Sequence, residues 1–347
     1  MIYRLKYDFC RWSDLANSKK ITEVVMRIGR DFTNLLNASF LTEDEKKQLK
    51  AATLTVADMD AKVQNKAKKD IINQVKVASE VLLDHVELDG GIPNPYLQMS
   101  SSEISKAKKE AEKRNITLSF HLPYTYVGAA VCAFQKEDRE MAVELMKRYI
   151  DFAAKLNCIN LVMHPGSVPF YQAVGLYRKL VRENLILSLK ELVPYAKKKG
   201  IMFHLENNTA FDSILVDVEE CLEILETIDP KGKTVKFCFD IGHWFTRADF
   251  GKQIPNPPEQ IMEVIPEKYI SQVHLNDYIP VVKKFHPPLH YQSGLLKKEN
   301  LEKLFEIFRK KKVEIVVMET AVREVDELLN TRVLMEKEAE YVREVMG

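Results

Sequence analysis

The chain has 347 residues, of which 46% are hydrophobic and 29% charged, so it can bury a sizeable core beneath a solvated surface. Its 51 Lys and Arg residues nearly balance its 50 Asp and Glu residues, and the formal charge of +1 argues against a protein that coats nucleic acid or membranes by bulk charge. No run approaches about 18 consecutive apolar residues, the N-terminus lacks a secretory signal pattern, and the five scattered cysteines form no CxxC pair. These features predict a globular, cytoplasmic protein without a membrane segment or a disulfide framework.

Eight short runs of apolar and β-branched residues have the length and composition of β-strands. They are residues 2–9, 81–88, 116–121, 158–164, 201–206, 235–240, 270–275 and 313–319. Amphipathic stretches with helical spacing follow many of them, at residues 139–156, 176–199, 217–228, 301–310 and 322–345. Strands that alternate with helices predict parallel βαβ units, and eight of them predict a (β/α)8 TIM barrel as one domain over residues 1–347.

The exception to this alternation is a polar stretch between the first two predicted strands. Residues 13–75 carry helical patterns and no strand signal, and Thr42 with Glu45 has the spacing of a capping box at a helix start. We therefore expect a helical insertion, or an extended first βα connection, rather than a separate domain.

The residues at or next to the ends of six successive predicted strands share one property, which is that they can bind metal or transfer protons. They are His121, His164, Glu206, Asp240, His274 and Glu319. In a parallel barrel these strand ends meet on the face that carries the active site. Three histidines and three carboxylates suit zinc or manganese, and oxygen ligands favour Mn²⁺ or Mg²⁺ if few histidines bind.

Other histidines fall into two groups by position. His243 follows Asp240 by three residues, and His286 and His290 lie on the loop after the seventh predicted strand. There His290 is the better ligand candidate, because Pro287 and Pro288 directly follow His286 and stiffen the loop. His85 and His204 lie inside strands, and a structural role is the better expectation for both.

Seven short motifs together resemble the xylose isomerase-like TIM-barrel superfamily. They are HLPY (121–124), MHPGS (163–167), LENNT (205–209), CFDIGH (238–243), HLND (274–277), HYQSG (290–294) and MET (318–320). The resemblance covers about residues 80–325, and the superfamily includes sugar-phosphate isomerases and epimerases as well as the endonuclease IV group.

The isomerase branch implies a single divalent metal (Mn²⁺, Zn²⁺ or Mg²⁺) bound by Glu206, Asp240, His274 and Glu319. By that resemblance the metal chelates a hydroxyl and a neighbouring carbonyl, while Glu206 and Glu319 act as catalytic bases that remove and return a proton through an enediolate. The substrate would then be a sugar, a sugar phosphate or a cyclitol, and the reaction an isomerisation, epimerisation or dehydration.

The endonuclease IV branch, a group of apurinic endonucleases, implies up to three metals and cleavage of a phosphodiester, in abasic DNA or in another phosphodiester substrate. By that resemblance His121 and His164 serve the first metal, and His243 serves the third together with an Asp-x-His motif. His290 aligns with the histidine of this motif, but Pro288 stands where its aspartate is expected. This departure and the balanced charge favour a small carbohydrate substrate over nucleic acid, with one to three metals left open.

Several residues near the strand ends are candidates for binding substrate. They are Tyr124, Trp244, Asn276, Arg247 and Arg323. Aromatic rings suit stacking against a sugar, and the arginines suit a phosphate or carboxylate. The oligomeric state and the role of residues 13–75 remain open at this level.

Overall fold

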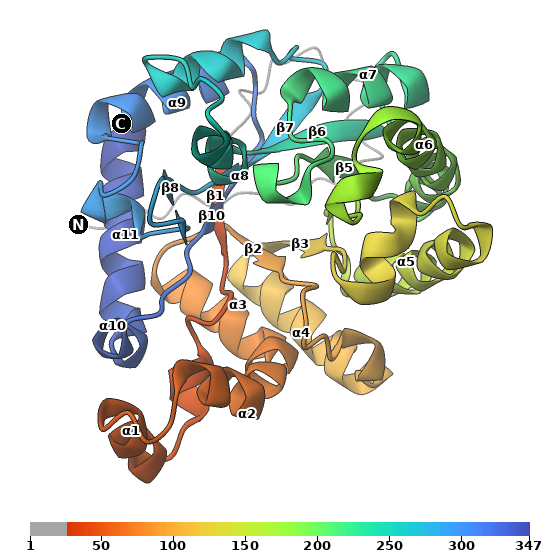
Figure 1. Cartoon of the computed structure of the whole chain (residues 1–347). Coiled ribbons are helices and arrows are strands. Elements are labelled where there is room, and N and C mark those ends of the chain that lie inside the picture. Colours follow the sequence, from red (N-terminus) through yellow and green to blue (C-terminus); the bar gives the residue numbers. More distant parts are fainter. Residues whose placement is uncertain (1–25) are drawn as a thin grey trace, which may run out of the picture.

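Eight parallel strands close into a barrel in the spatial order β1-β10-β7-β6-β5-β4-β3-β2 (Figure 1). The computed structural model describes residues 26–347. The barrel strands are β1 (Arg27–Asp31), β2 (His85–Leu88), β3 (Thr117–His121), β4 (Asn160–Met163), β5 (Met202–Glu206), β6 (Val235–Asp240), β7 (Ile270–Leu275) and β10 (Ile315–Glu319). The predicted (β/α)8 barrel is therefore confirmed, and seven of its strands lie within the predicted runs.

Helices surround the barrel and connect successive strands (Figure 1). They are α1 (Glu43–Lys50), α2 (Val56–Lys69), α3 (Ile71–Glu80), α4 (Ser101–Arg114), α5 (Lys136–Leu156), α6 (Gly175–Lys198), α7 (Val218–Ile228), α8 (Ile241–Phe245), α9 (Lys298–Lys310), α10 (Val325–Leu329) and α11 (Thr331–Met346). Short 3-10 turns lie at Asn37–Phe40, Tyr96–Gln98, Tyr126–Cys132, Phe170–Gln172, Ala210–Asp212, Thr246–Phe250, Pro258–Val264 and Leu289–Tyr291, and β8 (Tyr278–Ile279) pairs with β9 (Lys284–Phe285) in a small hairpin. Within the described part of the chain, no helix is both long and apolar enough to span a membrane.

The position of the first strand differs from the prediction. β1 lies at Arg27–Asp31, inside the stretch 13–75 that the sequence patterns assign to helix alone, and the predicted strand at 2–9 lies outside the described residues. The sequence RIGRD shows no apolar alternation, so the strand escapes recognition by pattern. Gly29 fits because an added Cβ would lie 2.7 Å from the Cβ of His85 on the neighbouring strand.

Three helices, α1, α2 and α3, lie between β1 and β2, in or next to the stretch where the sequence patterns predict helices. Thr42 and Glu45 form the expected capping box at the start of α1. Figure 1 shows α1 and α2 at the edge of the molecule, away from the barrel strands, whereas α3 packs beside β2 and α4 as the first helix of the barrel wall. The inserted helices are therefore α1 and α2.

A buried ion pair joins the first strand to the last helix. Arg30 on β1 and Glu338 on α11 are both fully buried, with 2.5 Å between Nη2 and Oε2. Glu338 also accepts hydrogen bonds from the Leu289 backbone N–H and from the Thr320 hydroxyl, each at 2.8 Å. The pair thus ties together the strand, the helix and two loops at the C-terminal face of the barrel.

Replacing Glu338 by Ala should lower the free energy of unfolding by about 3–5 kcal/mol, because the Arg30 guanidinium would stay buried without its partner. Glu336→Ala on the same helix is the matched control and should cost about 0.5 kcal/mol or less, since within residues 26–347 Glu336 makes only an exposed ion pair with Arg332. Urea denaturation of both variants measures the difference, and equal losses would contradict the structural role of the buried pair.

Candidate metal centre

The C-terminal ends of five barrel strands bring their last polar side chains into one buried cluster. His121, Glu206, Asp240 and Glu319 end β3, β5, β6 and β10, and His274 is the penultimate residue of β7. The strand register places Asp240 beside His274. Parallel strands of a closed barrel present these ends on a single face, so residues far apart in the sequence become neighbours.

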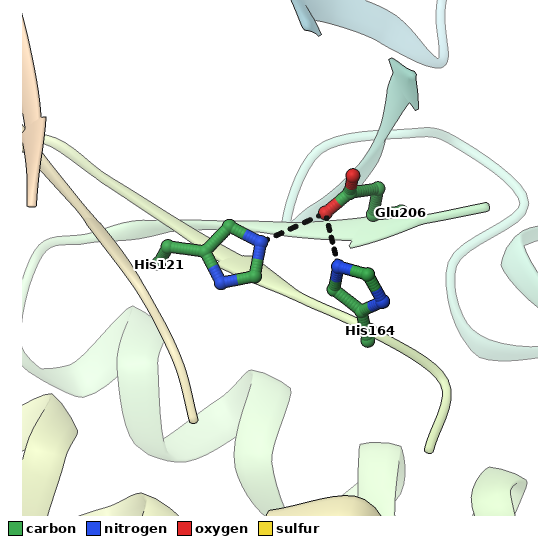
Figure 2. Close-up of side chains that lie close together, drawn as sticks. All are labelled: His121, His164 and Glu206. Atoms are coloured by element: carbon green, nitrogen blue, oxygen red, sulfur yellow. Dashed lines mark hydrogen bonds and ion pairs between the residues drawn. The ribbon is translucent and has the colours of Figure 1, made fainter. Parts of the chain in front are cut away.

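Two histidines face one oxygen of Glu206 (Figure 2). The Nε2 atoms of His121 and His164 lie 3.0 and 3.2 Å from Glu206 Oε2. The other ring nitrogens have separate partners, because His121 Nδ1 lies 2.9 Å from the Leu122 carbonyl and His164 Nδ1 lies 3.1 Å from Asn208 Oδ1. Outer partners of this kind fix ring orientation and direct the free nitrogen of each imidazole at a shared ligand position.

The second oxygen of Glu206 faces two more histidines. Glu206 Oε1 lies 3.2 Å from His274 Nδ1 and 3.3 Å from His243 Nδ1. His274 Nδ1 is also 3.1 Å from Glu319 Oε1 and 3.8 Å from Asp240 Oδ2. Glu206 is therefore shared between two groups of ligand atoms, one on each carboxylate oxygen.

Four side-chain groups of the described residues could each hold a metal ion, and they overlap in Glu206, Asp240 and His274. They are His121–His164–Glu206, Glu206–Asp240–His274, Asp240–His243–His286 and Glu87–His274–Glu319, and Glu319 also lies near His286. The separations of 3.0–3.3 Å around Glu206 are close to the roughly 3.3 Å between two ligand atoms of a tetrahedral zinc. The donor set therefore fits divalent ions.

Two amide side chains orient the carboxylates of the cluster through hydrogen bonds. Asn276 Nδ2 donates to Asp240 Oδ2 at 2.7 Å and to Glu319 Oε2 at 3.0 Å, while its Oδ1 accepts from the Gly242 N–H. Asn207 exchanges two hydrogen bonds with the Asp240 backbone, each at 2.9 Å. An added Cβ on Gly242 would lie 2.2 Å from Asn276 Oδ1, which explains the glycine at this position.

The charge of the cluster requires cations. Four buried carboxylates, Glu87, Glu206, Asp240 and Glu319, contact imidazoles, and within residues 26–347 none of the four pairs with a lysine or arginine. Isolated buried carboxylates are costly, so their charge must be compensated by protons or by metal ions.

Protons supply this compensation in the metal-free protein. Burial opposes the charged form of His121, but Glu206 outweighs it and raises the pKa of His121 to about 9. Burial likewise opposes the charged form of His243, while Asp240 and Glu206 raise its pKa to about 10. Burial raises the pKa of Glu319 well above its ordinary value, and the nearby Asp240 and Glu206 raise it further against the opposite effect of His274.

The loop after β7 contributes His286 to the cluster. His286 Nδ1 lies 3.7 Å from Glu319 Oε2, and its buried Nε2 has no hydrogen-bond partner in the described part of the chain. His290 belongs to none of the metal-competent groups of the described residues, and its nearest charged groups include Glu338 and Lys337. The structure thus places His286 in the cluster and leaves His290 outside it, although the sequence analysis prefers His290 as a ligand.

The five substrate-binding candidates lie at different distances from the cluster. Tyr124 borders it, with its ring centroid 5.1 Å from that of His121 and 5.0 Å from that of His164. Asn276 lies within it, as described above. Trp244 is buried in the core, where its ring lies 4.6 Å from the Arg247 guanidinium, and Arg247 pairs with Asp217 at 3.1 Å. Arg323 is exposed.

Sequence reasoning missed two carboxylates of this face. Glu87 is fully buried on β2, and its Oε1 lies 2.8 Å from His274 Nε2. It lies one residue before the strand end, so a search limited to the last residue of each strand does not find it. The sequence feature that could have identified Glu87 is a charged residue inside the apolar run 81–88. Asp31 ends β1 beside Glu319 and was missed because the first strand was placed too early in the chain.

His85 and His204 lie in the barrel interior and form hydrogen bonds with hydroxyl groups, which agrees with the structural role expected for both.

Comparisons with known proteins agree with this fold. A family model described as xylose isomerase-like TIM barrel matches residues 55–345. Among curated relatives, "Uncharacterized protein MJ1311" of Methanocaldococcus jannaschii is 28% identical over 162 residues, which cover 46% of this chain and 53% of that protein. "Probable endonuclease 4" of Acholeplasma laidlawii is 25% identical over 187 residues, which cover 52% of this chain and 60% of that protein. The chain thus spans little more than half the length of these relatives.

Solved structures with the same fold include sugar epimerases. A D-tagatose 3-epimerase-like protein has a TM-score of 0.60 at 20% identity and covers 93% of this chain and 100% of its own. A xylose isomerase-like TIM-barrel protein from Mycobacterium smegmatis in complex with magnesium has a TM-score of 0.54 at 15% identity, and covers 80% of this chain and 92% of its own. At these identities the likeness establishes the fold alone.

The stability of the metal-free protein should depend on pH in a defined direction. Because the folded-state pKa values of His121 and His243 exceed the ordinary 6.5, their protonation stabilises the fold fully below about pH 6.5, and this contribution is lost as the pH rises through about 9 to 10. Bound divalent ions replace these protons.

The Tm of chelator-treated protein should therefore fall between about pH 7 and 10, while the Tm of protein saturated with Zn²⁺ should fall less. Thermal unfolding at several pH values with and without Zn²⁺ measures this. Superimposable profiles for the two forms would contradict metal binding at the histidine cluster.

Proposed function

We propose that this chain, which belongs to the xylose isomerase-like TIM-barrel family, hydrolyses phosphodiester bonds at a centre of two tightly bound divalent ions. The observation that carries the proposal is the sharing of Glu206 between the His121–His164 pair on one oxygen and the His274–His243 pair on the other. A carboxylate that bridges two sets of ligands is typical of two-metal hydrolases.

Charge supports the number of ions. Glu87, Glu206, Asp240 and Glu319 would carry four negative charges when fully ionised, which two divalent ions would balance, whereas one ion would leave two of the charges to be compensated by protons. A third position at Asp240, His243 and His286 has one carboxylate that it shares with the second group, so we expect an ion there to bind more weakly.

Different residues of the cluster would bind the ions and accept the proton. His121, His164, Glu206, Asp240 and His274 would hold the ions, which when bound supply Lewis-acid activation of a water molecule and of the phosphoryl group. The water oxygen bonds to phosphorus, the bond to the leaving alkoxide breaks, and a nearby base takes a proton of the water. Glu319 suits this role because it lies at the edge of the cluster, and bound ions that replace the protons of the metal-free protein would leave its carboxylate ionised.

Two further residues orient the base and the substrate. Asn276 donates to Glu319 Oε2 and so directs that carboxylate. The ring of Tyr124, about a third exposed beside His121 and His164, offers an apolar surface for a sugar or base next to the phosphate. Abasic DNA is the first substrate to test, because the resemblance includes apurinic endonucleases and the Acholeplasma laidlawii relative is named "Probable endonuclease 4".

A second candidate function is the isomerisation or epimerisation of a sugar at one metal ion. It is favoured by the convergence of Glu206, Asp240, His274 and Glu319, the set that the isomerase branch uses, and by the fold shared with a D-tagatose 3-epimerase-like protein. In this alternative Glu206 and Glu319 transfer the proton, and His121 with His164 contact substrate hydroxyls. The extra histidine pair on Glu206 is the reason that we place hydrolysis first.

The metal-loaded protein should nick a duplex that contains an abasic site, and Glu319→Gln should lower the rate about 10²–10⁴-fold through loss of the base. Glu324→Gln, an exposed change five residues on, is the matched control and should keep the wild-type rate. Deuterium wash-in from solvent into ketoses and their phosphates is assayed in parallel. Wash-in without nicking would refute the hydrolase and favour the epimerase.

The third ion position can be tested by restoring a carboxylate. The endonuclease IV motif has an aspartate two residues before its histidine, which is position 284 if His286 takes that place and position 288 if His290 does. Since the structure brings His286 to the cluster, Lys284→Asp should add a more tightly bound third ion, and Pro288→Asp should not. Ions counted by native mass spectrometry distinguish the two variants, and a gain with Pro288→Asp alone would contradict this assignment.

A further inference from the structure

We propose that Glu87 is a positioning residue of the metal centre, which holds the His274 imidazole from its outer edge so that Nδ1 faces the ions. The inference rests on the proposed function only in that the centre binds divalent ions. It assigns a role to a buried carboxylate that the chemistry described above does not use.

The two edges of the His274 ring face different carboxylates. Glu87 Oε1 lies 2.8 Å from Nε2, whereas Glu319 Oε1 and Glu206 Oε1 lie 3.1 and 3.2 Å from Nδ1. Glu87 Oε1 is buried and faces His274 Nε2, so a neutral His274 that carries its proton on Nε2 directs that proton at Glu87. Nδ1 is therefore the nitrogen left for a metal ion.

Glu87 is itself held in place by a buried polar layer beneath the centre. Its Oε2 accepts hydrogen bonds from the Ser119 hydroxyl at 2.6 Å and from Gln272 Nε2 at 2.7 Å. Gln272 Oε1 in turn accepts from Asn160 at 2.9 Å, and Ser119 lies 2.8 Å from His85 Nε2. These residues come from β2, β3, β4 and β7, so a change in the direction of Glu87 breaks contacts across half the barrel.

The other histidines show why a charged partner matters. His121 and His164 also have their outer nitrogens fixed, but by the neutral oxygens of Leu122 and Asn208. A carboxylate partner makes an imidazole a stronger ligand than a neutral one does, because it stabilises the positive charge that the ring gains on binding a metal. His274 is thus expected to be a stronger ligand than His121 or His164.

Glu87 could instead be a ligand, because Glu87, His274 and Glu319 lie close enough to share an ion. The distance of 2.8 Å between Glu87 Oε1 and His274 Nε2 argues against this, since two ligand atoms of a tetrahedral zinc lie roughly 3.3 Å apart. The contact has the length of a direct pairing between an imidazole and a carboxylate.

The test is Zn²⁺ affinity, measured by competition with a chromophoric chelator, in the full chain and in Glu87→Gln. Gln keeps the shape of Glu87 but removes its charge, so we expect one of the bound ions to bind about 10–100-fold more weakly. The number of ions at saturating Zn²⁺ should stay the same, and the visible spectrum of the Co²⁺-loaded variant should shift. Glu80→Gln, at the exposed end of α3, is the control and should change neither measurement.

Each other outcome overturns the inference in a recognisable way. Wild-type affinity and an unchanged Co²⁺ spectrum in Glu87→Gln would refute it and leave the proposed function standing. Loss of one ion at saturation would make Glu87 a ligand instead. A wild-type protein that binds no ion would refute the proposed function as well. If Glu87→Gln does not fold, Ser119→Ala removes one donor to Glu87 and should weaken Zn²⁺ binding, and unchanged affinity in that variant would refute the inference.

Discussion

The arrangement of this site depends on the carboxylate of Glu206, which is fully buried at the end of β5 and faces four histidines. His121 and His164 contact one oxygen, and His243 and His274 contact the other. A carboxylate without a lysine or arginine partner is stable in this environment only if protons or cations compensate it. The buried negative charge that makes the site costly for the stability of the fold therefore also makes it suited to bind metal ions.

The fold meets this constraint with successive polar layers inside the barrel. The upper layer contains the ligand atoms, and Asn207 and Asn276 support it through hydrogen bonds to Asp240 and Glu319. Below it, Glu87 and Gln272 belong to a second buried layer that contacts the outer edge of His274. Side chains in such a network keep their direction without an ion, which reduces the reorganisation needed when one binds.

Much of the fold and of the site can be predicted from sequence because strand ends carry clear signals. A metal-competent residue at the end of an apolar run is easy to recognise, and parallel strands guarantee that such ends meet on one face. The first strand escapes recognition because RIGRD lacks apolar alternation, and with it Asp31 is missed. The choice between His286 and His290 depends on how a loop folds, and motif spacing alone favours the residue that lies outside the cluster. Glu87 is missed because its role depends on contacts with β3 and β7, which only the closed barrel creates.

The number of tightly bound ions tests this account most directly. Native mass spectrometry of the protein after mild dialysis against Zn²⁺-free buffer would count them, with Glu206→Gln beside the wild type. The account predicts two zinc ions in the wild type, and a loss of both from Glu206→Gln because Glu206 contributes to both positions. A wild-type protein that retains one ion would contradict the shared-carboxylate centre and favour the epimerase, and a protein that retains none would contradict metal binding altogether.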